Sequence, residues 1–187
     1  LISLDTNDQI KLEDITYEKK IGDVLNQLNN FKKVYFDDNG FPNIYSHFDQ
    51  CLFNTFMSYI DFDYYFPKSY KVHEDDRGSF AELIRTFSMG QSSMSITKKN
   101  QTRGNHFHTR KIERFSVIKG KALVSIRELL SDKIIKFELD GSSPSYVDIP
   151  IWHTHNIKNI GEKDLITIFW INEHYEDKTS DTYSEIV

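Results

Sequence analysis

The stretch Gly104-Asn105-His106-Phe107-His108 contains two histidines separated by one residue. Side chains alternate between the two faces of a β-strand, so this spacing directs both imidazoles to the same side. Glu113 opens the next segment after a polar connection, and Phe115 and Val117 share its parity, so we expect its carboxylate to face inward with them. A buried carboxylate without a partner is costly, and a divalent cation removes that cost. The stretch therefore predicts a metal site inside a β-domain.

A third histidine far downstream completes the expected ligand set. It lies in Pro150-Ile151-Trp152-His153-Thr154-His155-Asn156, late enough in the chain to return along a neighbouring strand. The predicted metal ligands are His106, His108, Glu113 and His155. Three nitrogen ligands and one oxygen ligand suit Zn, Fe, Ni or Mn, so the sequence leaves the identity of the ion open.

The first part of the chain has the spacing of helices. Apolar residues recur at three- and four-residue steps in two runs, which are Ile15, Ile21, Val24, Leu25 and Leu28, and then Phe48, Cys51, Leu52, Phe56 and Tyr59. Cys51 is the only cysteine, and we predict a buried small hydrophobe at this position. We expect a helical segment over residues 1–67. Because the chain begins at Leu1 in a polar stretch, we expect this segment to be the remnant of a longer upstream domain.

Beyond Pro67 the pattern changes to short alternating segments separated by turn residues. The expected strands cover residues 91–97, 113–118, 122–127, 134–139, 146–149 and 165–172. Many short strands at regular spacing favour a sandwich or a barrel, and a jelly-roll barrel closes its edges around a cavity. The sequence therefore predicts a mainly β domain over residues 68–187.

The composition argues against several kinds of partner. The formal net charge is -5 and lysine and arginine form no long run, so we expect no nucleic acid partner. The sequence shows no apolar run of membrane-spanning length and no leader pattern, so we expect no membrane partner and a cytoplasmic location. A single cysteine cannot form an internal disulfide, which fits a reducing compartment.

The spacing of the expected ligands resembles the two sequence motifs of the cupins. The first motif, His-x-His, four residues, Glu, six residues, Gly, extends to Gly120, and the second, Pro, four residues, His, three residues, Asn, runs from Pro150 to Asn159. There are two departures, because Gly104 lies nearer the first histidine than the usual leading glycine and Trp152 replaces an expected glycine. The resemblance implies a cupin (RmlC-like jelly-roll) barrel that binds a metal.

A further motif narrows the resemblance. Residues 75–82, Asp-Asp-Arg-Gly-Ser-Phe-Ala-Glu, resemble the Asp-x-Arg-Gly-x-Phe-x-Glu signature of cupins that act on deoxysugar nucleotides. Residues 75–187 are similar to the carboxy-terminal cupin of CapF-type capsular polysaccharide enzymes. The matching stretches are 76–80, 102–106, 147–150, 154–157 and 181–183. Residues 1–70 look like the end of the reductase domain that precedes the cupin in that family.

The resemblance also implies a function. In that family an amino-terminal reductase uses NADPH, and a zinc cupin epimerises a UDP-linked 4-keto-6-deoxy-N-acetylhexosamine at C3, for N-acetyl-fucosamine in capsule or O-antigen. We therefore expect a sugar-nucleotide epimerase that forms a homodimer, with Zn2+ or another divalent metal as cofactor. The sequence has no glycine-rich strand-to-helix turn, so we expect NADPH and reductase activity only where the missing reductase domain is present.

Epimerisation beside a keto group needs an acid, a base and a stabiliser for the enediolate charge. The candidate proton carriers are His153, Lys111 and Tyr183, whose alternative readings are a strand residue, a solvated charge and a tail contact. His153 stands where the family usually has tyrosine. Arg77 and Arg103 are candidates for holding the diphosphate, with surface ion pairs as the alternative. The metal is expected to act as a Lewis acid or as a clamp that orients the sugar.

Two other functions fit the same ligand set. Cupins with three histidines and one glutamate also activate oxygen as Fe(II) dioxygenases. A non-catalytic sugar-binding or dimerisation module is the third reading, because a fold alone does not establish chemistry.

Overall fold

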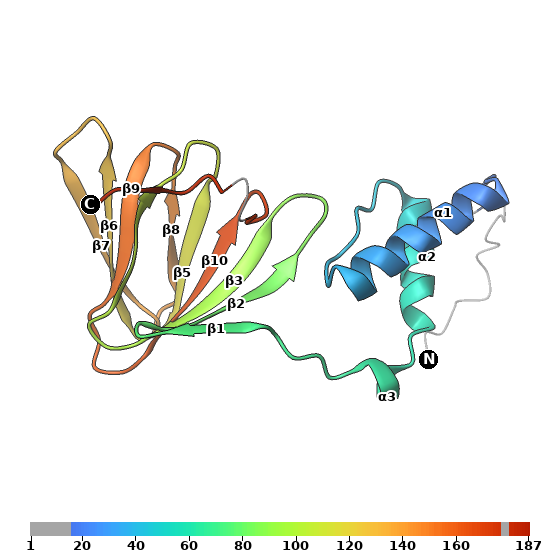
Figure 1. Cartoon of the computed structure of the whole chain (residues 1–187), viewed down its shortest axis with the longest axis horizontal. Coiled ribbons are helices and arrows are strands. Elements are labelled where there is room, and N and C mark those ends of the chain that lie inside the picture. Colours follow the sequence, from blue (N-terminus) through green and yellow to red (C-terminus); the bar gives the residue numbers. More distant parts are fainter. Residues whose placement is uncertain (1–15, 177–179) are drawn as a thin grey trace, which may run out of the picture.

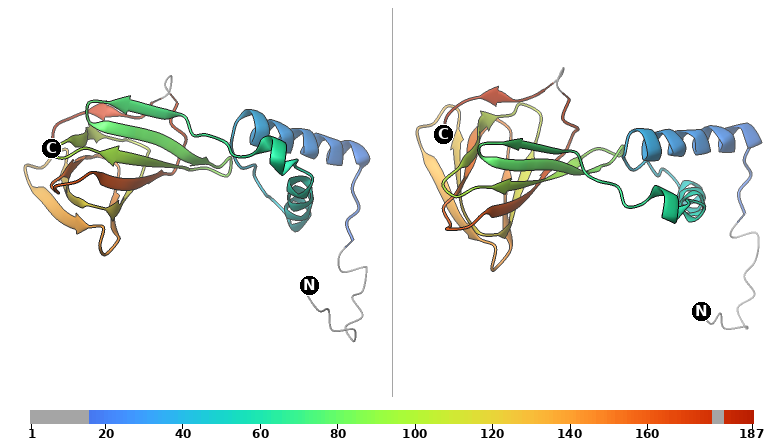
Figure 2. Two further views of the ribbon diagram at one scale, coloured as in Figure 1. Left: turned by 90° about the horizontal axis from the view of Figure 1, so that it is seen from below. Right: turned by 60° about the horizontal axis from the view of Figure 1, so that its bottom comes forward.

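The computed structural model of the protein describes residues 16–176 and 180–187. Helices come first in the chain, and a β-barrel follows. In Figures 1 and 2 the helices lie beyond one end of the barrel, and the carboxyl end of the chain lies on the barrel. The prediction of a mainly β chain preceded by a short helical segment is confirmed.

The helical part has its own starting signals. The hydroxyl of Ser46 accepts a hydrogen bond from the amide of Asp49, and the carboxylate of Asp61 accepts one from the amide of Tyr64, so each side chain caps a helix. The elements are α1 (Ile21–Lys32), the π-helical turn η2 (Lys33–Asp37), α2 (His47–Ser58) and α3 (Phe62–Tyr65).

These helices pack through a small aromatic cluster. The Phe31 ring is fully buried, with its centroid 5.1 Å from that of Phe53 and 6.0 Å from that of Phe56. Other apolar side chains face outward, and Ile21 and Tyr59 are 87% and 85% exposed. These helices therefore cover only part of the apolar surface that they present.

The helical spacing predicted for residues 21–28 is confirmed by α1, whereas Ile15 lies outside the described residues. The prediction that Cys51 is buried is wrong, because its side chain is exposed on α2. Its sulfur lies 3.8 Å from Nε2 of His47, one helical turn earlier. Helical spacing identified the apolar face of α2 but could not show that this face is partly open to solvent.

The barrel consists of short antiparallel strands, as the alternating pattern predicts. The segments expected over residues 91–97, 113–118, 122–127, 134–139 and 146–149 each lie within an observed strand, and that over 165–172 overlaps one. The strands are β1 (Val72–Asp75), β2 (Gly78–Arg85), β3 (Gln91–Thr97), β4 (Thr102–Phe107), β5 (Glu113–Lys119), β6 (Lys121–Glu128), β7 (Ile134–Asp140), β8 (Ser145–Ile149), β9 (His153–Asn159), β10 (Leu165–Ile171) and β11 (Tyr183–Ser184).

Two sheets form the barrel. The six-stranded sheet has the order β1-β2-β3-β10-β5-β8, and the five-stranded sheet has the order β11-β4-β9-β6-β7. Consecutive strands β4 and β5 lie in different sheets, so the connection between them crosses from one sheet to the other. The inner faces of the two sheets share one apolar core. It contains Phe115, Val117, Ala122, Val124, Ile126, Ile149, Ile157 and Leu165.

The helical segment meets the barrel at the connection between η2 and α2. The amide of Phe41 donates to the carbonyl of Arg85 at 2.8 Å, and the amide of Phe87 donates to the carbonyl of Phe41 at 2.9 Å. The last helix ends at Tyr65 and the first strand begins at Val72. A domain boundary near residue 67 stays a prediction.

Candidate metal centre

A β-bulge places the first histidine of the site. β4 pairs with β9 so that Gly104 lies opposite Asn156 and His106 lies opposite His155, which leaves Asn105 as the extra residue. Asn105 has a φ of 61°, and Gly104 has a φ of 99° with the carbonyl oxygen of His155 only 2.6 Å from where a Cβ would stand. Glycine at 104 thus allows the two strands to approach closely.

The bulge has a consequence that strict alternation does not predict. Arg103 is paired with the buried Ile157, so its side chain and that of His106 face the same interior, although they are separated by an odd number of positions. Without the extra residue Asn105, one of the two side chains would point outward.

The fourth expected ligand comes from the opposite sheet. Glu113 is the first residue of β5, with Phe115 and Val117 buried below it on the same face, as its parity predicts. Its Oε2 atom lies 2.7 Å from Nε2 of His155 and 3.3 Å from Nε2 of His108, and 3.9 Å from Nε2 of His106. Two imidazoles from the five-stranded sheet, and that of His108 directly after β4, therefore converge on one carboxylate from the six-stranded sheet.

The burial of these donor atoms shows that the cluster suits a cation. The four side chains offer ligand atoms within 4.8 Å of one another. Within the described residues, Nε2 of His108, Nε2 of His155 and Oε2 of Glu113 are buried without a hydrogen-bond partner. Buried polar atoms are normally paired, so unpaired atoms that point at one centre fit a metal ion.

The electrostatics of the cluster lead to the same conclusion. Burial alone raises the pKa of the Glu113 carboxyl, but the three imidazoles that face it hold its pKa well below the usual range. Burial lowers the pKa of His106, which favours the neutral ring that a metal requires. Burial also acts to lower the pKa of His108, but the Glu113 carboxylate that faces it outweighs burial and raises that pKa. The ionised carboxylate needs positive charge beside it, and a divalent ion supplies that charge.

Hydrogen bonds on the far side of two rings orient their Nε2 atoms. Nδ1 of His108 lies against the carbonyl oxygen of Asp181, and Nδ1 of His155 lies 3.0 Å from the carbonyl oxygen of His153. A proton on Nδ1 that donates to a carbonyl leaves Nε2 free to bind a metal, which is the usual arrangement around ligating histidines. Trp152, where the cupin motif has glycine, adopts a φ of 62° in the turn before these residues.

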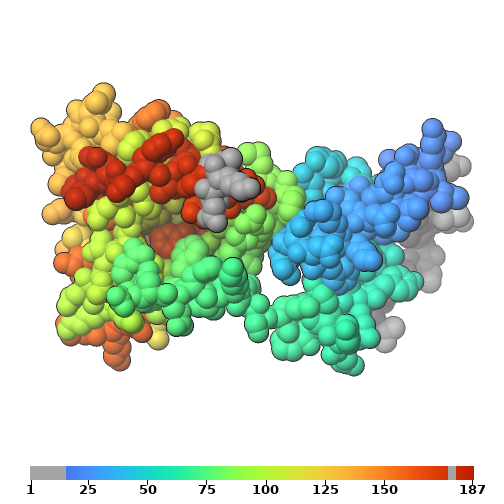
Figure 3. Space-filling view, in the orientation of Figure 1, coloured from blue at the N-terminus to red at the C-terminus, as the bar shows by residue number. Residues whose placement is uncertain are grey.

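The cluster opens into a cavity of about 1540 Å³ that extends to the helical segment. His106, His108 and Glu113 line it at the metal end, and Phe41 and Tyr65 line it at the helical end. Figure 3 shows this side of the barrel hollowed between the red C-terminal residues and the green first strands. The volume exceeds the usual range of small-molecule pockets, so the cavity has room for an extended ligand.

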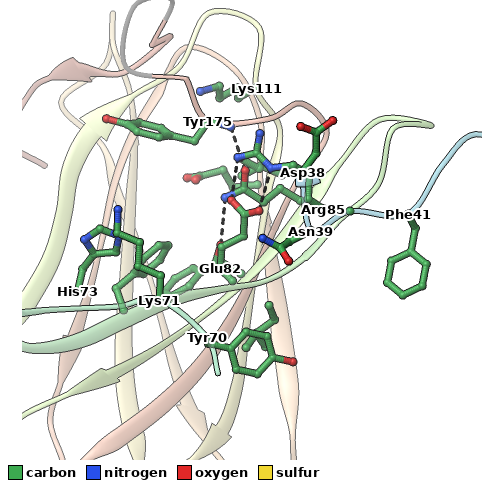
Figure 4. A pocket seen from close by; sticks show the side chains of 18 of the residues that line it. Asp38, Asn39, Phe41, Tyr70, Lys71, His73, Glu82, Arg85, Lys111 and Tyr175 are labelled. Carbon is green, nitrogen blue, oxygen red and sulfur yellow. Dashed lines mark hydrogen bonds and ion pairs between the residues drawn. The ribbon is translucent and has the colours of Figure 1, made fainter. Parts of the chain in front are cut away.

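Lys111 lines this cavity although it is almost completely buried, with 2% of its surface exposed. Its ammonium nitrogen lies 5.3 Å from the centroid of the Tyr175 ring, and Figure 4 shows the two side chains at the same end of the pocket. The side-chain nitrogen of Lys111 thus lies against an aromatic ring in the same cavity as the ligands.

The two predicted arginines line the same cavity. Nε of Arg77 donates to Asp75 at 3.0 Å, and Arg103 lies 3.6 Å from the same carboxylate. Arg103 also donates to the hydroxyl of Thr97 at 3.2 Å. Both arginines therefore form the ion pairs that the alternative interpretation predicts. Both guanidinium groups also border the cavity, which an anionic ligand can enter.

His153 and Tyr183 are not among the residues that line the cavity. The His153 ring bonds through Nδ1 with the carbonyl of Ile151 at 2.8 Å. The Tyr183 ring stacks on Phe107 with centroids 5.2 Å apart, on the face of β4 opposite to the ligand His106. Of the three candidate proton carriers, Lys111 is the one that faces the ligands.

Sequence reasoning missed one wall of the cavity. The inner face of β3 is polar, with Gln91, Ser93, Ser95 and Thr97 all buried. Hydropathy alternation favours placing the apolar residues of this strand inside, and the structure reverses that order. Of these residues, Gln91 and Ser93 line the cavity, whereas the Ser95 hydroxyl bonds with that of Thr167. Small polar residues at every second position were the signal for this polar inner face.

Fold and site together define a cupin-like barrel with a candidate metal centre of three histidines and one glutamate. The sequence of residues 73–183 matches the model of the polysaccharide biosynthesis C-terminal domain family. The chain belongs to this family. The predicted resemblance to CapF-type enzymes is confirmed by the structural comparison.

The capsular polysaccharide assembling protein CapF of Staphylococcus aureus superposes with a TM-score of 0.82 at 36% identity, over 91% of this chain and 46% of CapF. A Pseudomonas aeruginosa protein, UDP-2-acetamido-2,6-beta-L-arabino-hexul-4-ose reductase, is 32% identical over 90% of this chain and 45% of its own length. The chain therefore spans about half the length of these two relatives.

Two further matches cover a smaller share of the chain. The spore coat polysaccharide biosynthesis protein SpsL of Bacillus subtilis is 28% identical over 61% of this chain and 82% of SpsL. An oxalate oxidase in complex with glycolate superposes with a TM-score of 0.50 at 21% identity over 63% of each chain, which shows a shared fold alone. Among the described residues, the helices are too short or too polar to cross a membrane.

Proposed function

We propose that this chain epimerises a UDP-linked 4-keto-6-deoxy-N-acetylhexosamine at C3, with a divalent ion, Zn2+ in the first instance, at the ligand cluster. The observation that carries the proposal is the single cavity that joins His106, His108 and Glu113 to Lys111 and to both arginines. The Pseudomonas relative supports the substrate class, because its name specifies a UDP-linked 2-acetamido sugar with a keto group at C4.

The reaction requires no net oxidation or reduction. The C3–H bond breaks, its electrons delocalise onto the C4 oxygen, and a proton then adds to C3 from the opposite face. A bound divalent ion supplies Lewis acidity for the negative charge that develops on that oxygen. His106, His108, Glu113 and His155 hold the ion, and the buried apolar residues below them keep water from the floor of the site.

We propose Lys111 as the residue that transfers a proton at C3. It faces the cavity beside the ligands, and its ammonium position is fixed by the Tyr175 ring and by a buried stem. Its amine form accepts the proton from one face of C3, and the proton that adds to the opposite face comes from solvent in the open cavity. Arg77 and Arg103 lie on the same cavity wall, where their charge is suited to the diphosphate of the substrate.

The test is proton exchange in heavy water without nicotinamide. The metal-loaded protein should incorporate deuterium at C3 of the keto sugar, measured by mass spectrometry and NMR. Substituting Lys111→Met removes the transferable proton while keeping the length of the side chain, and should slow the exchange on the order of a hundredfold or more. Lys119→Met, on an exposed lysine at the end of β5, is the matched control and should leave the rate unchanged.

The same samples separate the other functions. Tight binding of the sugar without deuterium at C3 would identify a non-catalytic sugar-binding or dimerisation module. Oxygen consumption with Fe(II) would identify a dioxygenase. An unchanged rate in Lys111→Met would remove Lys111 from the mechanism and would direct the search for the proton carrier to His153 and Tyr183. Sedimentation of the same protein tests the homodimer that we propose.

A further inference from the structure

The C-terminal segment, defined as residues 181–186, runs beside β4, the strand that carries His106. Its strand β11 pairs with Phe107 and His106 at the edge of the five-stranded sheet. The amide of Glu185 then donates to the carbonyl of Asn105, the bulged residue, at 3.0 Å. The segment is therefore attached along the outer edge of the metal-binding strand.

The first residue of this segment is Asp181, and its side chain is completely buried. Its Oδ2 atom accepts hydrogen bonds from three consecutive amides, those of Thr109 at 3.0 Å, Arg110 at 2.7 Å and Lys111 at 3.0 Å. Its Oδ1 atom accepts from the Thr109 hydroxyl at 2.6 Å. Three successive N–H groups around one anion fix the path of the backbone that supplies them.

The same residue reaches a metal ligand through its backbone. The carbonyl oxygen of Asp181 is the partner of Nδ1 of His108, whose Nε2 faces Glu113. A single residue of the C-terminal segment, Asp181, thus contacts the connection between β4 and β5 at two points. These points are a predicted metal ligand and the backbone of the cavity lysine, Lys111.

We propose that Asp181 is a positioning residue of the metal centre. Its carboxylate fixes residues 109–111 so that Nε2 of His108 points at the ion and the Lys111 side chain points into the cavity. The inference rests on the proposed function for its metal, and it assigns to the C-terminal segment a role in building the site.

The hydrogen bonds predict how substitutions at 181 differ. In Asp181→Asn the amide oxygen can take the Oδ2 position and accept from the three amides, while the amide nitrogen donates to the Thr109 hydroxyl. This variant keeps the geometry and loses the charge. Asp181→Ala loses both and leaves buried amides without an acceptor. A positioning role therefore predicts a large difference between the two variants.

The experiment measures Zn2+ affinity of the full chain by competition with a chromogenic chelator, with no sugar present. Asp181→Ala should weaken Zn2+ binding about 10- to 100-fold, because the carboxylate that fixes the backbone next to His108 is lost and the orientation of that ring is no longer held. Asp181→Asn should stay within a few-fold of wild type. The visible spectrum of bound Co2+ should change in Asp181→Ala, because one imidazole is reoriented, and should be retained in Asp181→Asn.

Glu185→Ala is the matched control, because Glu185 belongs to the same segment but bonds with Arg127 at 2.7 Å, away from residues 109–111. Its Zn2+ affinity should equal that of wild type. If Asp181→Ala does not fold, Asp181→Ser, which offers one short acceptor, replaces it with the same expected loss.

The inference is overturned by equal affinities in Asp181→Ala and wild type, by equal losses in the Ala and Asn variants, or by an equal loss in Glu185→Ala. A lower unfolding temperature with unchanged affinity and an unchanged Co2+ spectrum would also overturn it. If wild type binds no Zn2+, the metal centre of the proposed function falls and this inference falls with it. If wild type binds and the variants do not differ, only this inference falls.

Discussion

The barrel and the helical segment bury their apolar side chains to different degrees. In the barrel, Val117, Val124 and Ile157 belong to one continuous core that is closed between two sheets. In the helical segment the buried apolar residues among those described are Phe31, Val34 and Ile60, and the helices expose large side chains to solvent. A closed core is stabilised by its own contacts, whereas an open aromatic cluster depends on an additional covering surface.

This difference explains where the candidate chemistry lies. A site that must hold four ligand atoms within a few tenths of an ångström needs a rigid support, and both sheets of the barrel provide it. The described part of the helical segment, from residue 16 onward, contributes to the far end of the cavity and no ligand of the candidate metal centre. We therefore expect metal binding and proton transfer to depend on the barrel, and the helical segment to affect the far end of the substrate.

The largest effect should come from the ligands themselves. Glu113→Ala or His155→Ala should empty the site and slow C3 exchange by two or more powers of ten, on the order of the contribution of a catalytic metal. The far-ultraviolet spectrum should stay β-rich, because the apolar core lies below the cluster. Metal analysis and exchange rates check this, with Glu138→Ala, an exposed carboxylate on β7, as the control. Full occupancy in His155→Ala would remove that residue from the ligand set.

A core substitution in each region tests the comparison directly. Ile157→Ala in the barrel should lower the free energy of unfolding by about 2–5 kcal/mol and weaken metal binding, because a cavity forms next to β4. Phe31→Ala removes an equally buried side chain from the helical segment. This substitution should leave the unfolding transition of the metal-loaded barrel unchanged. Calorimetry resolves the two cases. A common loss in both variants would show that the two regions unfold as one unit.

Limited proteolysis tests the same difference without a substitution. The helical segment exposes apolar surface and is joined to the barrel by few backbone hydrogen bonds, so early cuts should fall before Pro67. A folded, metal-binding fragment from about residue 70 should remain, as identified by mass spectrometry. Equal resistance of both regions would mean that the segment is as well packed as the barrel.

The sequence predicted most of the barrel because period-two alternation and glycine turns are local signals. It also predicted that His106, His108 and Glu113 lie together, since their spacing along the chain fits two consecutive strands that face one interior. It could not predict the bulge at Asn105, which depends on how β4 pairs with β9 and which turns Arg103 inward. The sequence could not predict the hydrogen bonds of the Asp181 carboxylate either. Their donors lie about seventy residues earlier in the chain and are backbone amides, which have no sequence signature.

The smallest effect on stability should come from surface ion pairs. Such pairs occur in both the barrel and the helical segment, so they do not explain why the two regions differ in how well they are packed. In the barrel, Arg114 donates to Asp148 at 2.7 Å, and in the helical segment Lys33 lies 2.6 Å from Asp38. Exposed pairs contribute little, so Asp148→Asn and Asp38→Asn should hardly change thermal stability at neutral pH.

The small contribution of the Arg114–Asp148 pair to thermal stability should depend on pH. The hydrogen bond from Arg114 lowers the pKa of the Asp148 carboxyl in the folded protein. A carboxyl whose pKa is lower when folded stabilises the protein above its unfolded pKa, about 4, and loses that contribution as the pH falls further. Thermal melts of wild type and Asp148→Asn should therefore coincide more closely as the pH is lowered from about 5 to about 3. A gap that widens on acidification would mean that Asp148 stabilises the barrel by something other than its charge.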